Sequence, residues 1–210
     1  MASDTTKTSI SNLALGWLSV KRITSIETTD TSLEAVRCRM HYDQTREELL
    51  RQFDWPFAIT RISLSNHEDT PAFDWDYQFD LPTDYLRFLG DQSQDDSNDL
   101  GNRWTVESGR ILTNQSTLYL LYIRNEDDPT KFDPLFISVL ALSMAVRMGY
   151  QFAGTGNITH KLVENLEGKL DKELGKARTA CRRETDASGR SNWNWAKFRN
   201  TTGRPDRSYS

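Results

Sequence analysis

Apolar residues recur at helical spacing between Thr31 or Ser32 and about Gln52, which predicts an amphipathic helix. Thr31 and Ser32 are both suitable N-caps, and Glu34 follows Thr31 by three residues, as in a capping box. Pro56 comes next and disfavours continuation of the helix. The predicted apolar face consists of Ala35, Cys38, Tyr42, Leu49 and Phe53, with Arg46 as its one polar interruption.

Two further helices are predicted on either side of this one. A short helix is expected from about Ile10 to Ser19, after a Ser/Thr-rich segment, residues 1–9, that we expect to be mobile. Asp133 and Pro134 are a capping residue and a proline at the first helical position. Residues 135–152 are apolar on nearly every side, so they predict a buried central helix.

A narrow apolar stripe marks the last predicted helix, from about Asn157 to Glu184. The helix would be roughly 40 Å long and would pack on the flank of a bundle. Gly168 and Gly175 weaken a helix, so they predict close approach by a neighbouring element. The stripe consists of Ile158, Leu162, Leu166, Leu170, Leu174, Ala177 and Cys181.

Residues 57–128 have the patterns of strands. Apolar and polar residues alternate between Phe73 and Leu81, which is the period of a half-buried strand. Residues 104–113 predict a hairpin with Ser108-Gly109 at its turn. Leu118–Arg124 is a further strand candidate, because it is rich in Leu, Tyr and Ile.

These elements predict an α+β fold: a bundle of about four helices with an inserted small antiparallel β subdomain and an extended C-terminal arm. We expect the N-terminal segment and first helices of the bundle in residues 1–56 and the β subdomain in 57–128. Residues 129–186 would form the C-terminal helices of the same bundle, and 187–210 the arm. The length of 210 residues and the hydrophobic fraction of 37% suit a globular domain.

The charge of the chain is distributed unevenly. The whole chain has a net charge of −4, residues 187–210 have +4, and the remainder therefore has −8. A generic nucleic-acid binder usually carries a basic excess, which this chain lacks. Nothing at the N-terminus resembles a signal peptide. The longest apolar run, Leu135 to Met148, is interrupted and shorter than the ~20 residues that span a bilayer, so we expect a soluble intracellular protein.

The sequence predicts no catalytic, cofactor-binding or metal-binding residues. His41, His67 and His160 lie on separate segments without metal-site spacing, and no serine occupies a nucleophile elbow. Cys38 and Cys181 are interpreted as buried thiols, with a disulfide or metal pair as the alternative. Residues 154–157 favour a helix–helix turn over a phosphate cradle, because they follow a helix and lack a lysine.

Aspartates cluster in the middle of the chain. Asp74, Asp76 and Asp80 are predicted to share one strand face, and a loop covers residues 91–102. Carboxylate clusters can bind Ca²⁺ or Mg²⁺, but the loop lacks the spacing of a calcium-binding loop. A solvated acidic face is the favoured interpretation, and a subunit contact, a surface that repels DNA and a metal site are the alternatives. The loop aspartates are Asp91, Asp95, Asp96 and Asp99.

The C-terminal arm interleaves aromatic and basic residues. Such a segment can stack on single-stranded bases, but Trp, Tyr and Arg also dominate protein interfaces. The arm has too little apolar mass to fold alone, so we favour ordering on a partner over a nucleic-acid contact or disorder. Its candidate binding residues are Arg190, Trp193, Trp195, Lys197, Phe198, Arg199, Arg204 and Arg207.

Four short patterns follow one another along the chain. They are C-R-x-x-Y-D-x-x-R-x-x-L-L from Cys38 with Trp55-Pro56-Phe57-Ala58, then Pro71–Phe73 with Tyr77–Arg87, then Gly109–Asn114 with Leu121–Ile123, and finally Phe132–Phe136. Their succession, over roughly residues 13–180, resembles the tail tubular protein A family of short-tailed phages. The motif residues, expected to be structural, are Arg39, Tyr42, Asp43, Arg46, Trp55, Phe57, Phe73, Phe79, Pro82 and Asp84.

The resemblance implies a non-enzymatic head-to-tail adaptor of the virion, assembled in the host cytoplasm. Such proteins form a twelve-subunit ring between the portal protein and the tail nozzle, around the DNA exit channel, and tail fibres often attach outside. We expect the arm to dock on the portal, and the acidic loop to touch the nozzle, a fibre or a neighbouring subunit. An acidic body would let DNA pass without gripping it.

Closed rings need two complementary faces on each subunit. Arg37 and Arg39 could supply one face, and Asp43, Glu47 and Glu48 the other, although simple solvation of the helix is the alternative. The competing functions are a connector of a long-tailed phage or a capsid-side adaptor, a DNA-binding packaging or ejection factor that uses the basic arm, and a hydrolase with an acidic metal site.

Overall fold

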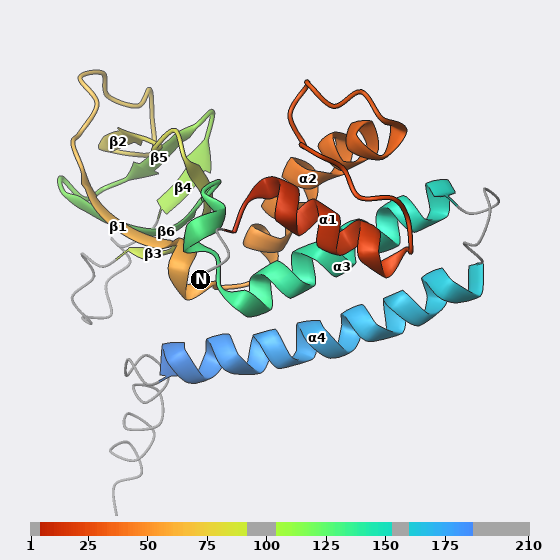
Figure 1. Ribbon diagram of the computed structural model, residues 1–210. Helices are drawn as coiled ribbons and strands as arrows, with labels where there is room; N and C mark the ends of the chain where they lie inside the picture. The colour runs from red at the N-terminus through yellow and green to blue at the C-terminus, as the bar shows by residue number, and fades with distance from the viewer. Residues whose placement is uncertain (1–4, 92–103, 153–159, 187–210) are drawn as a thin grey trace, which may run out of the picture.

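The computed structural model describes residues 5–91, 104–152 and 160–186, and within them it has the predicted α+β fold (Figure 1). The α-helices are α1 (Lys7–Trp17), α2 (Leu33–Gln52), α3 (Pro134–Phe152) and α4 (His160–Asp186), with short 3-10 turns η1 (Pro56–Ala58) and η2 (Pro129–Lys131). All the described strands lie between α2 and α3. They are β1 (Ile59–Leu64), β2 (Tyr77–Asp80), β3 (Tyr85–Asp91), β4 (Trp104–Glu107), β5 (Arg110–Thr113) and β6 (Leu118–Arg124).

Helix α1 begins earlier than the sequence pattern suggests. The Thr6 hydroxyl accepts from the Ser9 backbone N–H at 3.0 Å, and the Ser9 hydroxyl accepts from the Thr6 N–H at 2.9 Å. This reciprocal capping box fixes the first turn. The expectation of a mobile N-terminal segment is therefore wrong for Lys7–Ser9, which belong to the helix.

Helix α2 has nearly the predicted bounds, but its cap is different. Ser32 is the N-cap and accepts from the Ala35 N–H at 3.3 Å, so the predicted capping box of Thr31 and Glu34 is wrong. Arg39 donates to three backbone carbonyls of the α1–α2 connection, those of Ile26, Glu27 and Asp30. This one side chain therefore holds the connection against α2.

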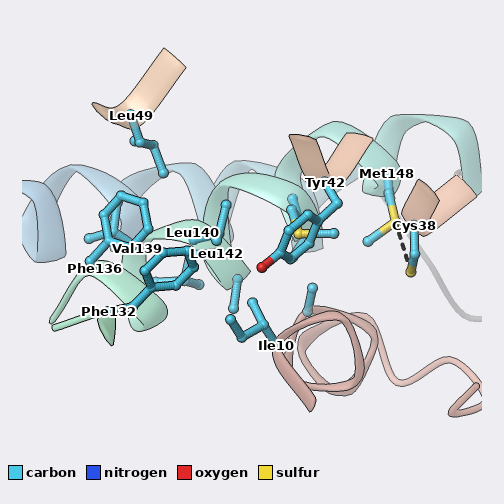
Figure 2. Close-up of a cluster of buried hydrophobic side chains, with 14 of the residues drawn as sticks. Ile10, Cys38, Tyr42, Leu49, Phe132, Phe136, Val139, Leu140, Leu142 and Met148 are labelled. Carbon is cyan, nitrogen blue, oxygen red and sulfur yellow. Dashed lines mark hydrogen bonds between the residues drawn. The ribbon is translucent and has the colours of Figure 1, made fainter. Parts of the chain in front are cut away.

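Helix α3 is the centre of the bundle. It is long and apolar enough to cross a membrane by length and composition, alone among the described helices, but most of it is buried in the fold, as in a core helix of a soluble protein. Helix α3 is also longer than the apolar run Leu135–Met148, so its length does not distinguish a core helix from a membrane span. Its burial in the fold is what indicates a core helix. The Asp133 carboxylate accepts from the Leu135 N–H at 2.7 Å, as the predicted capping requires. Figure 2 shows Phe136, Val139 and Leu140 of α3 in the core that they share with Ile10 of α1 and Tyr42 of α2.

Helix α4 packs along α3 through the predicted stripe. Leu166 and Ala177 are buried, and Leu162, Leu170, Leu174 and Cys181 are partly buried against the same core. The close approach predicted at the helix glycines does not come from the described residues of the same subunit, because Gly168 and Gly175 are exposed and nothing there lies within 4 Å of a Cβ built on either. The close approach occurs at Gly149 of α3, where an added Cβ would lie 2.9 Å from Val163 Cγ2 of α4.

The strands form two antiparallel three-stranded sheets, with strand orders β1-β6-β3 and β2-β5-β4. Strand β6 is apolar on both faces. Ile123 belongs to the helical core, whereas Leu118, Leu120 and Tyr122 join Phe79 and Ile111 of the second sheet in a smaller core. The first sheet therefore lies between the bundle and the second sheet.

The strand predictions are only partly correct. The β4–β5 hairpin turns at Ser108-Gly109 as predicted, and both residues have positive φ, 49° and 78°. The strand predicted over residues 73–81 is wrong in its first half, since β2 begins at Tyr77 and Phe73 is 76% exposed. Asp74 has a φ of 66°, outside the β region, and breaks the extended backbone there. Strands β1 and β3 were not predicted.

Candidate interaction surfaces

A buried arginine joins the helices to the first sheet. Arg46 of α2 is 3% exposed, and its Nη1 donates to the Glu126 carbonyl at 2.6 Å and to Asn125 Oδ1 at 2.5 Å. The carboxylates of Asp43 and Glu47 lie 3.5 and 3.4 Å from its Nη2. A buried guanidinium needs such partners, because an unpaired buried charge is strongly destabilising. Arg46, which interrupts the apolar face of α2, therefore holds the first sheet against the bundle.

Three more polar links hold the start of β3 against its neighbours. The Tyr122 hydroxyl donates to Asp84 Oδ1 at 2.9 Å, and burial together with this hydrogen bond raises the pKa of Tyr122 to about 12. Arg51 of α2 donates to the Leu86 carbonyl at 2.9 Å. Arg87 pairs with Asp54, just beyond the end of α2. The first link joins β6 to the residue before β3, and the other two tie α2 and its C-terminal end to β3.

An aromatic cluster packs between the C-terminal end of α2 and the N-terminal end of α3. Trp55 is buried, and its Nε1 donates to the Leu49 carbonyl at 2.9 Å. The ring of Phe136 lies 4.9 Å from that of Trp55, 5.1 Å from Phe57 and 5.0 Å from Phe132, centroid to centroid. All three pairs are steeply inclined, which is a favourable arrangement of aromatic rings.

The motif residues occupy mostly structural positions. Arg46, Trp55 and Phe57 lie at the junction of bundle and sheet, and the Asp84 carbonyl accepts there from the Asn125 N–H. Tyr42 is buried in the bundle (Figure 2). The remaining ones lie at separate points: Arg39 on the α1–α2 connection, Asp43 beside Arg46, Phe79 between the sheets, and Pro82, whose carbonyl accepts from the Tyr85 N–H.

Phe73 is the exception among these residues. It lies at a groove of about 550 Å³ beside the second sheet, with Trp75, Gln78, Arg110 and Leu112 in the lining. Since Phe73 is largely exposed, it does not contribute to a core among the described residues. It is the motif position that a structural role in this subunit explains least.

The β region is the most acidic part of the chain. Residues 57–128 contain fourteen Asp and Glu against five Lys and Arg, a net charge of −9. Asp80 pairs with Arg110 at 2.9 Å, and its other oxygen lies 3.8 Å from His67. Asp74 and Asp76 precede β2, so the prediction that they share a strand face with Asp80 is wrong. Within the described ranges, no group of three or more His, Cys, Asp or Glu is arranged to hold a metal ion.

Several predicted binding residues lie outside the described ranges. These include the whole C-terminal arm, with Arg190, Trp193, Trp195, Lys197, Phe198, Arg199, Arg204 and Arg207. They also include Asp95, Asp96 and Asp99 of the acidic loop, and the turn at residues 154–157. Asp91, the first residue of that loop, ends β3.

The charged residues suggested as ring faces make contacts inside the subunit. Arg37 lies over the ring of Phe152, and Arg39 binds backbone carbonyls. Glu48 pairs with Arg147 of α3. Asp43 and Glu47 remain 63% and 43% exposed although both approach Arg46, so these two can still meet a partner.

Helix α2 also has an apolar outward face that the sequence patterns did not predict. Leu33, Val36 and Met40 are 57%, 38% and 63% exposed, and Asp43 and Gln44 continue the same face. The spacing of three, four and three residues is as regular as that of the buried face. The signal was therefore present in the sequence, but it was obscured by the stronger pattern on the opposite side of the helix.

The chain matches no protein-family model, and no curated protein matches it either.

Proposed function

We propose that this protein is a structural, non-enzymatic head-to-tail adaptor of a phage virion, which forms a ring between the portal and the tail nozzle around the DNA exit channel. The ring has twelve copies if the chain follows the family that it resembles. One observation carries the proposal. The motifs behind the resemblance lie far apart in the sequence, yet Arg46 and Asp84 both hydrogen-bond Asn125 at the end of β6. Trp55 and Phe57, from the same motifs, pack together on Phe136 of α3.

The junction supports this proposal because a ring subunit must transmit load between different neighbours. Hydrogen bonds from Arg46 and Arg51 and the ion pair of Arg87 with Asp54 connect the bundle to the sheet. Polar links of this kind fix one orientation more sharply than apolar contacts, which are non-directional. The bundle and the β region can therefore contact different partners in a constant geometry.

The charge of the β region also supports a role beside DNA without tight binding. Each Lys or Arg on a phosphate adds affinity by counterion release, whereas a segment with a net charge of −9 repels phosphates. The basic arm favours a second candidate, a DNA-binding packaging or ejection factor. The two candidates differ in the partner that the chain binds first.

The decisive experiment is native mass spectrometry of the purified chain alone and with the portal protein of the same phage, supported by light scattering. We expect a ring on the portal, whether or not the chain assembles alone. A chain that does not bind the portal, and that forms no ring either alone or in the mixture, contradicts the proposal. DNA retention by the isolated chain that weakens steeply with salt would favour the DNA-binding factor instead.

The acidic loop has its own test in the same assay. Replacing Asp91, Asp95, Asp96 and Asp99 together by Asn keeps the size of the side chains and removes their charge. We expect weaker attachment of the nozzle, a fibre or a neighbouring subunit. Unchanged assembly would remove the loop from the contact surface and leave the ring itself unaffected.

A further inference from the structure

Helix α2 presents an apolar face to solvent. Leu33, Val36 and Met40 are exposed along two turns, and no described element covers them. Two exposed carboxylates, those of Asp43 and Glu47, lie further along the helix toward its C-terminus. Contiguous exposed apolar residues with a charged rim are typical of protein interfaces. Their arrangement specifies a partner that is flat or hollow at one end and basic at the other.

Helix α4 presents a face of that kind. Gly168 and Gly175 are exposed on it, and each destabilises the helix by about 1 kcal/mol relative to alanine. Nothing in the described residues lies within 4 Å of a Cβ at either position, so packing within the subunit does not require glycine. A helix surface without side chains at two such positions leaves hollows into which the side chains of another helix fit.

The two faces match in spacing and in charge. Leu33 and Met40 are separated by seven residues, as are Gly168 and Gly175, and both intervals are about 10.5 Å along a helix axis. Acidic residues follow the apolar stretch of α2, and on α4 the exposed Arg182 follows the glycines, beyond Lys176, which pairs with Glu173 at 2.7 Å. A parallel alignment therefore brings apolar side chains onto glycines and carboxylates toward cations. The exposed charges add little affinity, but they set the register.

The position of the helices excludes contact between these faces within one copy. In Figure 1, α1 and α2 lie on one side of α3 and α4 on the other, and the buried residues of α2 and α4 belong to the core around α3. We propose that the outward face of α2 docks on the outward face of α4 in a second copy. Such a contact is heterologous: it leaves one α2 and one α4 unused, so further copies can add until the ring closes.

This inference rests on the proposed ring and names the surfaces that build it. Cysteine cross-linking tests it directly, in a Cys181→Ser background that removes the partly exposed native thiol. One sample carries Met40→Cys, a second carries Gly175→Cys, and a third mixes the two, each alone and bound to the portal. A short bis-maleimide should cross-link dimers in the mixture only. A chain with both substitutions should give a ladder of oligomers that ends at the ring.

Matched controls separate this contact from others. Tyr119→Cys is also exposed, but it lies on β6, so its mixture with Gly175→Cys should give no dimer. Gly168→Leu with Gly175→Leu should raise the thermal stability of the monomer, since space is free at both sites and leucine favours a helix over glycine, yet should lower ring formation at least tenfold.

Four outcomes overturn the inference. Cross-linking of Met40→Cys with itself would mean an isologous contact, and equal cross-linking of the Tyr119→Cys control would mean non-specific collision. A ring of full mass without cross-links in the mixture would mean that other faces, or the portal, cover α2, while the proposed function stands. If neither a ring nor portal binding is detected, the proposed function fails together with this inference.

Discussion

The guanidinium of Arg46 and the backbone carbonyl of Glu126 are 2.6 Å apart, although 80 positions separate them in the sequence. Arg46 belongs to the middle of α2, and Glu126 follows β6, the central strand of the first sheet. The contact therefore closes the segment that contains every described strand. Its geometry suits arginine, because one planar group donates to the carbonyl and to the Asn125 side chain together.

Arg46→Met should destabilise the fold by about 3 kcal/mol, because it removes two hydrogen bonds from a charged group and leaves the Glu126 carbonyl unpaired. Urea unfolding followed by circular dichroism measures the loss. Arg46→Lys is the matched control. It keeps the positive charge but lacks the planar guanidinium with its several donors, so it should recover only part of the stability. A wild-type midpoint in Arg46→Met would show that the junction is held by its apolar contacts alone.

Tyr42 should behave as an apolar core residue. Its ring is 1% exposed, its hydroxyl has no hydrogen-bond partner among the described residues, and burial holds its pKa above the ordinary value. Tyr42→Phe should therefore change the free energy of unfolding by less than about 1 kcal/mol. Tyr42→Ala should lower it by about 4 kcal/mol, because it leaves a cavity in the bundle. Equal stabilities of Tyr42→Ala and wild type would contradict the packing role.

The helix glycines should respond in opposite directions. Gly168→Ala should raise the free energy of unfolding by about 1 kcal/mol, since alanine favours a helix and the site is open. Gly149→Ala should lower it by about 2 kcal/mol, because the new Cβ would meet Val163 at 2.9 Å. Thermal unfolding of the two variants side by side gives the answer. A gain in stability at Gly149 would mean that α3 and α4 can separate at little cost.

Acid should weaken the α1–α2 connection through Asp30. Its carboxylate accepts from the Ser32 N–H and from the N–H and hydroxyl of Thr24, each at 3.0 Å, and these bonds hold its pKa well below the ordinary 3.8. Because the folded pKa is lowered, the stabilisation is complete above the ordinary value and is lost as pH falls below it. Urea midpoints from about pH 6 to about pH 3 should fall less for Asp30→Asn than for wild type. If the urea midpoints of wild type and Asp30→Asn fall in parallel with pH, Asp30 does not contribute to the loss of stability in acid.

Deleting residues 187–210 should abolish binding to the portal, because the arm carries the candidate anchors Trp193, Trp195 and Phe198. Changing each anchor to Ala should weaken binding roughly tenfold or more, as for an interface hot spot. Changing the arm's five Lys and Arg to Gln is the control. If this control alone removes binding and the anchor variants do not, charge and not aromatic packing makes the contact. Full portal binding by the truncated chain would falsify the arm hypothesis.

The sequence predicted the elements whose signals are local. Asp133-Pro134 begins α3 and Ser108-Gly109 turns the β4–β5 hairpin, because capping and positive φ depend on a few adjacent residues. The alternation from Phe73 predicted a strand that begins only at Tyr77. Periodicity gave no sign of the turn at Asp74. Strand β3 was missed because its pairing with β6 is irregular at two points, which disrupts the alternation of its side chains.

The candidate surfaces were harder to predict, because they depend on which elements meet. Arg46 interrupts an apolar face in the sequence, and only the fold brings Asn125 and Glu126 against it. Gly168 and Gly175 predicted close approach by a neighbouring element, yet both are exposed in the subunit. Spacing along one helix shows that a residue has a role, but it does not show whether its partner belongs to the same chain.

Strand β6 has a consequence for how the molecule unfolds. Neighbouring residues Tyr122 and Ile123 lie in different cores, one between the sheets and one shared with the helices. Neither core can open without disturbing the strand that also completes the other. Helices and sheets should therefore melt as one cooperative unit and not as separable pieces.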